Sequence, residues 1–262
     1  MNDVLSAEGI ARYRRHRELR RRVYETIDST NTALKAMAAE GAEAGLALVA
    51  ASQTAGRGRM GRSFYSPVGS GLYLSLLLRP TLPAAQAVRL TACAAVAVAE
   101  TVEELSGRET AIKWVNDVYM DARKVCGILT EASVDMAHGT LRWAVVGVGV
   151  NLRRPAGDFP EELRGIAGAA FDGIDAPELR CRLAAGILDR LADYAENPAD
   201  PAIFEGYRRR SFVLGREIDV LAPGKDPEPA VALGLDDDYS LLVRLPDGGL
   251  RRLSSGEVSV RI

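Results

Sequence analysis

The segment 56–61 reads Gly-Arg-Gly-Arg-Met-Gly and lies between two apolar runs of strand length, 46–51 and 71–78. Its spacing matches the G-x-G-x-x-G fingerprint of dinucleotide-binding folds. That fingerprint requires a helix to begin at the third glycine, because the pyrophosphate sits on the helix N-terminus. Here Gly61 is followed by a polar stretch with proline and glycine, and then by the second strand. The sequence therefore excludes a Rossmann site and predicts a long loop between two strands.

Arginines alternate with the glycines of this loop, at Arg57, Arg59 and Arg62. Glycines let the main chain come close to a ligand, and guanidinium groups offer paired donors to a phosphate or a carboxylate. The loop is therefore either an anion-binding site or a solvated basic hairpin. The loop alone does not distinguish the two.

The composition is that of an ordinary globular protein. The 262 residues have a formal charge of −2, and 47% of them are hydrophobic. The length suits one large domain or a main domain with a small companion, and the near-neutral charge gives no reason to expect nucleic acid as a partner. The longest apolar-rich stretch, 84–99, is interrupted by Gln86 and Arg89, which predicts no transmembrane helix, and no signal-peptide pattern is present. Three widely spaced cysteines argue against disulfides and a zinc site, so we expect a cytoplasmic protein.

Seven arginines lie between residues 12 and 22. We interpret this segment as a solvated helical lead-in. The alternative is a polyanion-binding arm, but the segment is too short for a DNA-reading domain of three helices.

Hydrophobic periodicity divides the main part of the chain into helices and strands. Capping side chains at 28–30 precede a helix that ends at Gly41, and an alanine-rich buried helix is predicted over 84–105. A Gly/Pro-rich connector at 153–175 leads to another amphipathic helix at 177–194. Strands are predicted at 46–51, 71–78, 110–114, 118–120, 124–132 and 141–151.

After Tyr207 the sequence changes to short strands separated by tight turns. Five strands in about fifty residues predict a small barrel of the SH3 kind. They are expected at 216–221, 229–235, 240–245, 250–253 and 258–262. We therefore divide the chain into a lead-in (1–22), a main domain (23–210) and a C-terminal SH3-like domain (211–262).

Lysine is rare in this chain, with only four among the 33 cationic residues. Two of them, Lys113 and Lys124, flank a predicted hairpin that also carries Asn116 and Asp117. An ammonium is a compact point charge and not a planar fork, so both lysines are candidates for a role that arginine does not fill. Trp114 alternates with Lys113 on a strand, and we interpret it as core packing.

Four blocks together resemble the biotin–protein ligases. In the family's order they are 28–31 (Asp-Ser-Thr-Asn), then Gln53 with 56–62 and 71–75, then 113–117 (Lys-Trp-Val-Asn-Asp) with 124–129 (Lys-Val-Cys-Gly-Ile-Leu), and finally 147–151 (Gly-Val-Gly-Val-Asn). Each block alone is weak, but four in order are specific. Two departures are Val115, where the family commonly has proline, and Cys126, where it has a small residue. Neither departure removes a charged group.

The resemblance implies an α+β fold in which a mixed sheet with flanking helices is followed by the small SH3-like β-barrel. The catalytic core would be the class II aminoacyl-tRNA synthetase-like core of the biotin and lipoate ligases. The chain looks like the short form of the family, without the N-terminal DNA-binding domain.

The resemblance also implies a reaction in two steps, with ATP and biotin as substrates and Mg²⁺ as the metal. The biotin carboxylate attacks the α-phosphate of ATP, which gives biotinyl-5′-AMP and pyrophosphate. A lysine of a biotin carboxyl carrier protein then attacks the mixed anhydride. The residue types suit this chemistry, because fixed cations and Mg²⁺ offset the repulsion between a carboxylate and a triphosphate.

By the same resemblance the site residues fall into three groups. The catalytic residues are Lys124, which holds the biotin carboxylate, with Asp117 and Arg59. The biotin-binding residues are Ser29, Thr30, Asn31, Gln53, Arg57, Gly58, Arg59 and Lys124, of which Ser29, Thr30, Asn31 and Gln53 hydrogen-bond the ureido ring. The ATP-binding residues are Arg57, Arg59, Arg62, Lys113, Asn116 and Asn151. Asp117 has three open roles, which are deprotonating the acceptor lysine, binding Mg²⁺ and orienting Lys113. No metal ligands are assigned.

Two other functions stay open. A lipoate– or octanoate–protein ligase has a related fold, but its pocket takes a long apolar chain, whereas the polar residues 29–31 and Gln53 favour a ureido ring. A non-catalytic biotin-binding regulator would not need both lysines and the carboxylate. The expected partners are the carrier protein and, by resemblance only, a second copy of the chain in a homodimer. Neither DNA nor a membrane is expected.

Overall fold

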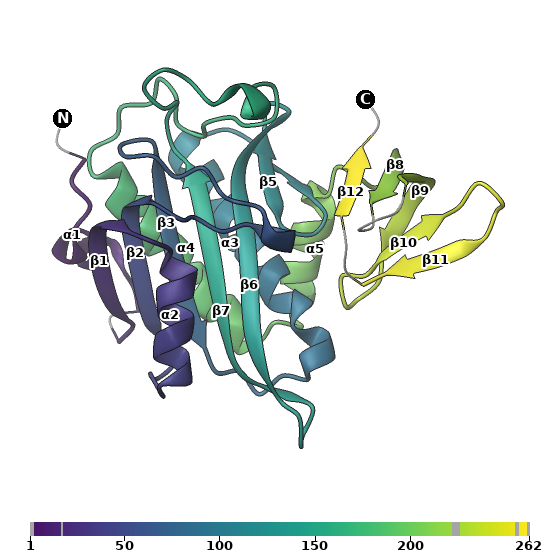
Figure 1. The fold of residues 1–262 in the computed structure, drawn as a ribbon, viewed down its shortest axis with the longest axis horizontal. Helices are drawn as coiled ribbons and strands as arrows, with labels where there is room; N and C mark the ends of the chain where they lie inside the picture. Colours follow the sequence, from purple (N-terminus) through teal and green to yellow (C-terminus); the bar gives the residue numbers. More distant parts are fainter. Residues whose placement is uncertain (1–2, 17, 222–225, 255–256, 261–262) are drawn as a thin grey trace.

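The computed structural model describes residues 3–16, 18–221, 226–254 and 257–260, and these form two sheets with helices packed on the larger one (Figure 1). The larger sheet has seven strands in the order β1-β2-β3-β7-β6-β5-β4. Its strands are β1 (Arg20–Ile27), β2 (Leu46–Gln53), β3 (Gly71–Leu78), β4 (Ala111–Lys113), β5 (Asp117–Met120), β6 (Arg123–Asp135) and β7 (Thr140–Asn151). β1 and β2 are parallel, and the other neighbours are antiparallel, so the sheet is mixed as expected.

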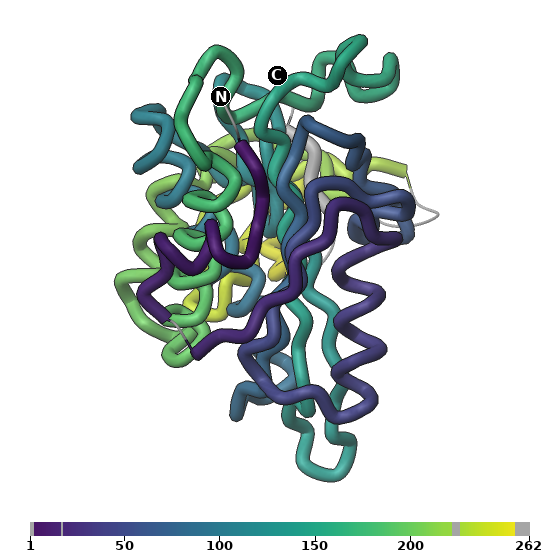
Figure 2. The backbone as a smooth tube through the Cα atoms, turned by 90° about the vertical axis from the view of Figure 1, so that its left-hand side faces the viewer, coloured from purple at the N-terminus to yellow at the C-terminus, as the bar shows by residue number. Residues whose placement is uncertain are grey.

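Helices cover both faces of this sheet. The helices are α1 (Ala7–Tyr13), α2 (Thr30–Ala39), α3 (Val88–Ser106), α4 (Leu179–Glu196) and α5 (Pro201–Arg210). In Figure 2, α2 lies on one side of the sheet and α4 lies on the other. Strand side chains alternate between the faces with period two. Thus Leu72, Leu74 and Leu76 of β3 enter the main core with α3 and α4, whereas Leu77 packs under α2.

The alanine-rich helix α3 is the central helix of the main core. It ends at Gly107, whose φ of 69° provides a left-handed C-cap. The span Ala84–Ser106 is long and apolar enough to cross a membrane, contrary to the interruption expected from Gln86 and Arg89, but 67% of its tested window is buried inside the protein. Its hydrophobicity is therefore explained by its place in the core.

The smaller sheet is antiparallel and has the order β11-β10-β9-β8-β12. Its strands are β8 (Glu217–Leu221), β9 (Glu228–Leu235), β10 (Leu241–Arg244), β11 (Leu250–Leu253) and β12 (Glu257–Val260). Its apolar cluster includes Trp114 and Val115, which belong to the large domain. The indole Nε1 of Trp114 donates to the carbonyl of Tyr239 at 2.8 Å. Trp114 is therefore core packing, as predicted, but the core is that of the neighbouring sheet.

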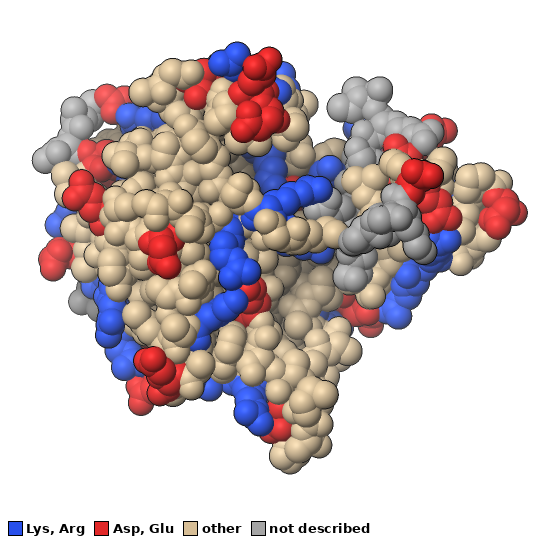
Figure 3. Space-filling view, viewed as in Figure 1, with Lys and Arg blue, Asp and Glu red and all other residues tan. Residues whose placement is uncertain are grey.

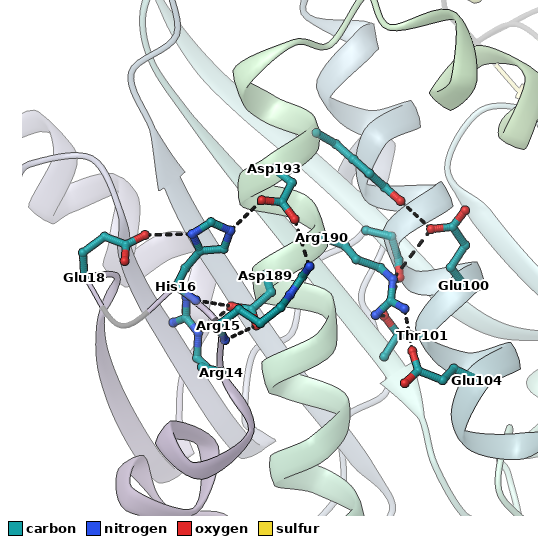
Figure 4. A network of polar contacts seen from close by, with 12 residues as sticks. Arg14, Arg15, His16, Glu18, Glu100, Thr101, Glu104, Asp189, Arg190 and Asp193 are labelled. Atoms are coloured by element: carbon teal, nitrogen blue, oxygen red, sulfur yellow. Dashed lines mark hydrogen bonds and ion pairs between the residues drawn. The ribbon is translucent and has the colours of Figure 1, made fainter.

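The N-terminal segment is the expected solvated helical lead-in only in part. Arg12, Arg15, Arg20 and Arg22 are exposed, but the helix ends at Tyr13 and the segment packs on α4. Ile10 is fully buried in the main core, and β1 begins at Arg20, within the expected lead-in. Arg14 is 5% exposed, and its Nε donates to the buried carboxylate of Asp189 at 3.0 Å. The same carboxylate accepts the main-chain N–H of Arg15 at 2.6 Å. Figure 4 shows this network joining the N-terminal segment to α4.

His16 extends the network at its exposed end. Its Nε2 lies 2.5 Å from the carboxylate of Asp193, and its Nδ1 lies 3.0 Å from Glu18. The hydrogen bond to Asp193 raises the pKa of His16 above its ordinary value, against an opposing effect of burial. This contact therefore stabilises the folded state below the unfolded pKa, and its contribution is lost as the pH rises through the folded pKa.

We predict that Asp189→Asn lowers the free energy of unfolding by about 3–5 kcal/mol, because it leaves the guanidinium of Arg14 buried without its counter-charge. Urea titration followed by far-UV circular dichroism measures the change. Asp193→Asn is the control, since its carboxylate is partly exposed and its loss should cost about 1 kcal/mol or less. Equal losses in the two variants would contradict the assignment.

Candidate functional site

A small recess of about 50 Å³ lies on the α2 face of the large sheet. Three elements surround it: the start of α2, the glycine loop between β2 and β3, and the turn between β4 and β5. In Figure 1 the glycine loop, in dark blue, crosses in front of β7 and β6. The lining residues are Ser29, Thr30, Asn31, Gln53, Arg57, Gly58, Arg59, Phe64, Asn116, Lys124, Gly127, Ile128, Leu129, Gly147, Val148 and Gly149.

Neutral polar side chains form one end of the recess. Ser29 is the N-cap of α2, and its hydroxyl accepts from the N–H of Thr32. The N–H and hydroxyl of Thr30 both donate to Oε1 of Gln53, at 2.9 and 3.2 Å. Ser75, on the neighbouring strand β3, has its hydroxyl 2.8 Å from that of Thr30. These groups hold one another in place, which makes this end a pre-ordered hydrogen-bonding surface.

Asn31 joins this polar end to the floor. Its Oδ1 lies 2.6 Å from the hydroxyl of Ser75, and its Nδ2 donates to the carbonyl of Leu129 and to Oε2 of Glu131. The amide rests on Gly147, where an added Cβ would lie only 2.1 Å from Asn31 Oδ1. Glycine is therefore required at this position by the close approach of the amide.

Two more glycines keep the middle of the floor flat. Gly127 of β6 and Gly149 of β7 are directly opposite each other in the sheet. The ring of Phe64, from the glycine loop, lies on both, within 2.9 Å of a Cβ built at either position. The ring of Phe64 can lie this close to the sheet only because Gly127 and Gly149 have no side chains.

Cations form the other end of the recess. Lys124 Nζ lies 2.7 Å from Oδ1 of Asp117, which also accepts from Asn116 Nδ2 at 3.0 Å. Asn116 Oδ1 in turn accepts from Arg59 Nη1 at 2.9 Å. The described contacts of Asp117 are therefore with Lys124 and Asn116. The Trp114–Val115 peptide bond that precedes this turn is cis.

The main chain of Lys124 is fixed by the connector that follows β7. The N–H of Lys124 donates to the carbonyl of Ile166 at 2.8 Å, and its carbonyl accepts from Gly168 at 2.9 Å. Because these bonds are independent of the β5–β6 hairpin, Lys124 is held from both sides.

The charge of this region is positive overall. Arg57, Arg59 and Lys124 line the recess, whereas the nearby carboxylates of Asp117 and Glu131 each form an ion pair with a cation. In Figure 3, Lys and Arg side chains form a band over the glycine loop and the neighbouring strands. A site of this kind can bind a carboxylate or a phosphate and reduce the repulsion between two such anions.

The structure brings together most of the residues that the sequence predicted. The nine that line the recess are Ser29, Thr30, Asn31, Gln53, Arg57, Gly58, Arg59, Asn116 and Lys124. Asp117 lies directly behind Lys124. Arg62, Lys113 and Asn151 are not among the lining residues, and Lys113 instead lines a second hollow with Tyr119 and Phe212. Their assignment to ATP stays a prediction.

Sequence reasoning assigned no role to Phe64, Gly147, Gly149 and Glu131. The residues on β6 and β7 could have been found from strand alternation, because Gly127, Leu129 and Glu131 are two residues apart and share a face. Phe64 gave no such signal, since nothing in a loop sequence shows which side chain turns inward.

The fold and the site define a protein that binds a small molecule with a neutral polar end and an anionic end. Comparison with known proteins is consistent with this class. The family model described as the biotin/lipoate A/B protein ligase family matches residues 23–151. The chain belongs to the biotin protein ligase family, which confirms the resemblance and the fold class expected from the sequence.

Three relatives illustrate the similarity. The biotin–[acetyl-CoA-carboxylase] ligase of Mycobacterium tuberculosis is 34% identical over 238 residues, which cover 88% of this chain and 85% of the relative. The bifunctional ligase/repressor BirA of Bacillus subtilis is 33% identical over 245 residues, with coverages of 90% and 73%. The solved structure of biotin protein ligase from Aquifex aeolicus in complex with biotin and ATP is 29% identical, with a TM-score of 0.75 and coverages of 92% and 98%.

We predict that Gly147→Ala destabilises the protein by about 1–3 kcal/mol, because the new methyl group overlaps the Asn31 amide, which is held by Ser75, Leu129 and Glu131. Urea unfolding measures the effect. The matched control is Gly234→Ala in β9, where a Cβ meets no atom within 4 Å. A Gly147→Ala protein as stable as the control would show that Asn31 is free to move.

Proposed function

We propose that this chain is the ATP-dependent ligase that activates biotin as biotinyl-5′-AMP and transfers it to a lysine of a biotin carboxyl carrier protein. One observation carries the proposal: a neutral hydrogen-bonding end and a cationic end belong to the same recess, at the two ends of a flat glycine floor. Biotin has the matching polarity, with a ureido ring at one end and a carboxylate at the other.

The ureido ring presents one carbonyl and two N–H groups, so it needs short neutral donors and acceptors. In the proposal these come from Ser29, Thr30, Asn31 and Gln53. Hydrogen bonds among these side chains order them before the ligand arrives, so less conformational entropy is lost on binding. The same polar end disfavours the apolar tail of lipoate or octanoate, because that tail would leave the polar groups of the protein without hydrogen-bond partners in the ligand.

In the first step an oxygen of the biotin carboxylate attacks the α-phosphorus of ATP, and the bond from that phosphorus to the bridging oxygen of pyrophosphate breaks. Lys124 is assigned to the carboxylate, and Arg57 and Arg59 to the phosphates. Fixed cations in a partly closed site stabilise the charge that develops in the transition state. Closure of the glycine loop would shield the reactive adenylate from water.

In the second step the amine of the acceptor lysine attacks the acyl carbon, and AMP leaves. The acceptor must first lose a proton, and Asp117 is assigned as the base, since its carboxylate lies beside Lys124 at the cationic end. The orienting role that the sequence suggested toward Lys113 is assigned instead to Lys124, because its Nζ lies 2.7 Å from Oδ1 of Asp117.

Mg²⁺ fits this site as an ion carried by the phosphates of ATP. The described residues include no cluster of three His, Cys, Asp or Glu side chains, and both carboxylates beside the recess are paired with cations. Mg²⁺ commonly binds through substrate phosphates with one or two protein carboxylates. When bound it would offset the triphosphate charge.

The remaining assignments are also proposals. The rest of the ATP is assigned to Arg62, Lys113, Asn116 and Asn151. The boundary at 210/211 is retained, whereas the boundary at 22/23 is given up because it falls within β1. We propose a cytoplasmic protein whose partners are the carrier protein and a second copy of the chain, with neither DNA nor a membrane as a partner.

The direct test is biotin-dependent exchange of labelled pyrophosphate into ATP in the presence of Mg²⁺. We expect exchange with biotin and little with octanoate or lipoate, for the polarity reason above. Exchange with octanoate but not biotin would favour the lipoate ligase alternative. Biotin binding without exchange would favour the non-catalytic regulator.

We predict that Lys124→Ala reduces biotin-dependent exchange by about 100-fold or more, because it removes the ammonium assigned to the reacting carboxylate. Lys124→Arg keeps the charge but not its compact geometry, so it should recover only part of the loss. Ordinary exchange by Lys124→Ala would overturn the assignment.

A further inference from the structure

Glu131 is a half-buried carboxylate on the recess face of β6 that the reaction scheme above does not use. Its Oε1 lies 2.5 Å from Lys35 Nζ of α2 and 3.5 Å from Arg57 Nη2 of the glycine loop. Its Oε2 accepts from Asn31 Nδ2 at 3.1 Å. Glu131 thus joins three elements, because it belongs to the sheet and contacts both the helix that carries the polar end and the loop above the recess.

Among the described contacts of the loop, two arginine side chains reach the sheet domain from its tip. Arg59 reaches Asn116 on the turn between β4 and β5. Arg57 reaches Glu131 on β6. The tip itself is tied mainly to its own stem, through the bridge between Arg57 and Ser63 and the bond from Gly58 N–H to Arg62 carbonyl. These two side-chain contacts and the ring of Phe64 are therefore among the interactions that hold the loop over the recess.

We propose that Glu131 is a positioning residue that anchors the glycine loop over the recess through Arg57. The anchor is electrostatic, because the carboxylate faces one cation from α2 and another from the loop. Asn31 holds one oxygen of the carboxylate, and the other oxygen faces Arg57 as well as Lys35, so the contact with Arg57 does not require Lys35. The retention role of this anchor rests on the proposed function, whereas its effect on the loop does not.

The ionisation of Glu131 agrees with the geometry. Burial raises its pKa, but the hydrogen bonds from Lys35 and Asn31 and the charges of Lys35 and Arg57 outweigh burial, so the pKa lies below its ordinary value. Glu131 is therefore a full negative charge at neutral pH.

The first test is limited trypsin digestion of the ligand-free protein, because Arg57, Arg59 and Arg62 are cleavage sites within the loop. Glu131→Gln keeps the side-chain length and an oxygen that accepts from Asn31, but it removes the charge. We expect trypsin to cleave Glu131→Gln between residues 57 and 63 about twofold to fivefold faster than the wild type. Mass spectrometry of the fragments measures the rate. Glu131→Asp, which keeps the charge, should restore part of the protection.

Two control variants separate the anchor from general effects. Lys35→Gln removes the α2 partner but leaves Glu131 facing Arg57, and Asp135→Asn removes a carboxylate from the same strand at the far hairpin. Both should cleave at the wild-type rate. Unchanged cleavage in Glu131→Gln would overturn the anchor, and so would equal acceleration in Lys35→Gln, since α2 would then be the cause.

The second test measures escape of the adenylate from the enzyme to free hydroxylamine. We expect Glu131→Gln to release it about twofold to fivefold faster, with biotin-dependent pyrophosphate exchange near the wild-type rate. Equal release from Glu131→Gln and wild type would overturn the retention role. If the wild type shows no biotin-dependent exchange, the proposed function fails, and the trypsin result still decides whether Glu131 anchors the loop.

Discussion

The ion pair between Lys124 and Asp117 is the interaction on which the arrangement of the cationic end depends. Its two members come from adjacent strands of one hairpin, β5 and β6. Lys124 is also fixed by the connector through Ile166 and Gly168. The hairpin and the connector thus both fix the position of the pair. Such a fixed position suits a charge that must be in place before an anionic ligand arrives.

Much of the site could be predicted because its residues carry local signals. Ser29 follows the rules for a helix N-cap, and Gly58 with its flanking arginines gives a loop that is recognisable by composition alone. The two lysines of the 113–124 window stand out because lysine is otherwise rare in the chain. The fold placed Lys124 in the recess but Lys113 beside a different hollow.

The parts that could not be predicted depend on contacts between distant segments. Arg14 and Asp189 are 175 residues apart, so nothing in the basic N-terminal run shows that it faces a buried carboxylate. Strand β1 was missed because Arg20 and its neighbours read as a charged lead-in, although the strand pairs along its length with β2. Helix α5 was missed as well, since its three terminal arginines hide a short apolar face that packs on α3. The role of Glu131 depends on three elements at once.

Trp114 and Val115 lie in the apolar cluster of the C-terminal sheet, immediately before Asn116 and Asp117. The apolar cluster of the C-terminal sheet is therefore completed by side chains from outside that sheet, and the turn with Asn116 and Asp117 follows directly from residues packed against the C-terminal sheet. Neither module is interchangeable on its own. A chimaera that exchanged the C-terminal domain for that of another protein would have to exchange the Trp-Val dipeptide with it, and the two segments are expected to change together during evolution.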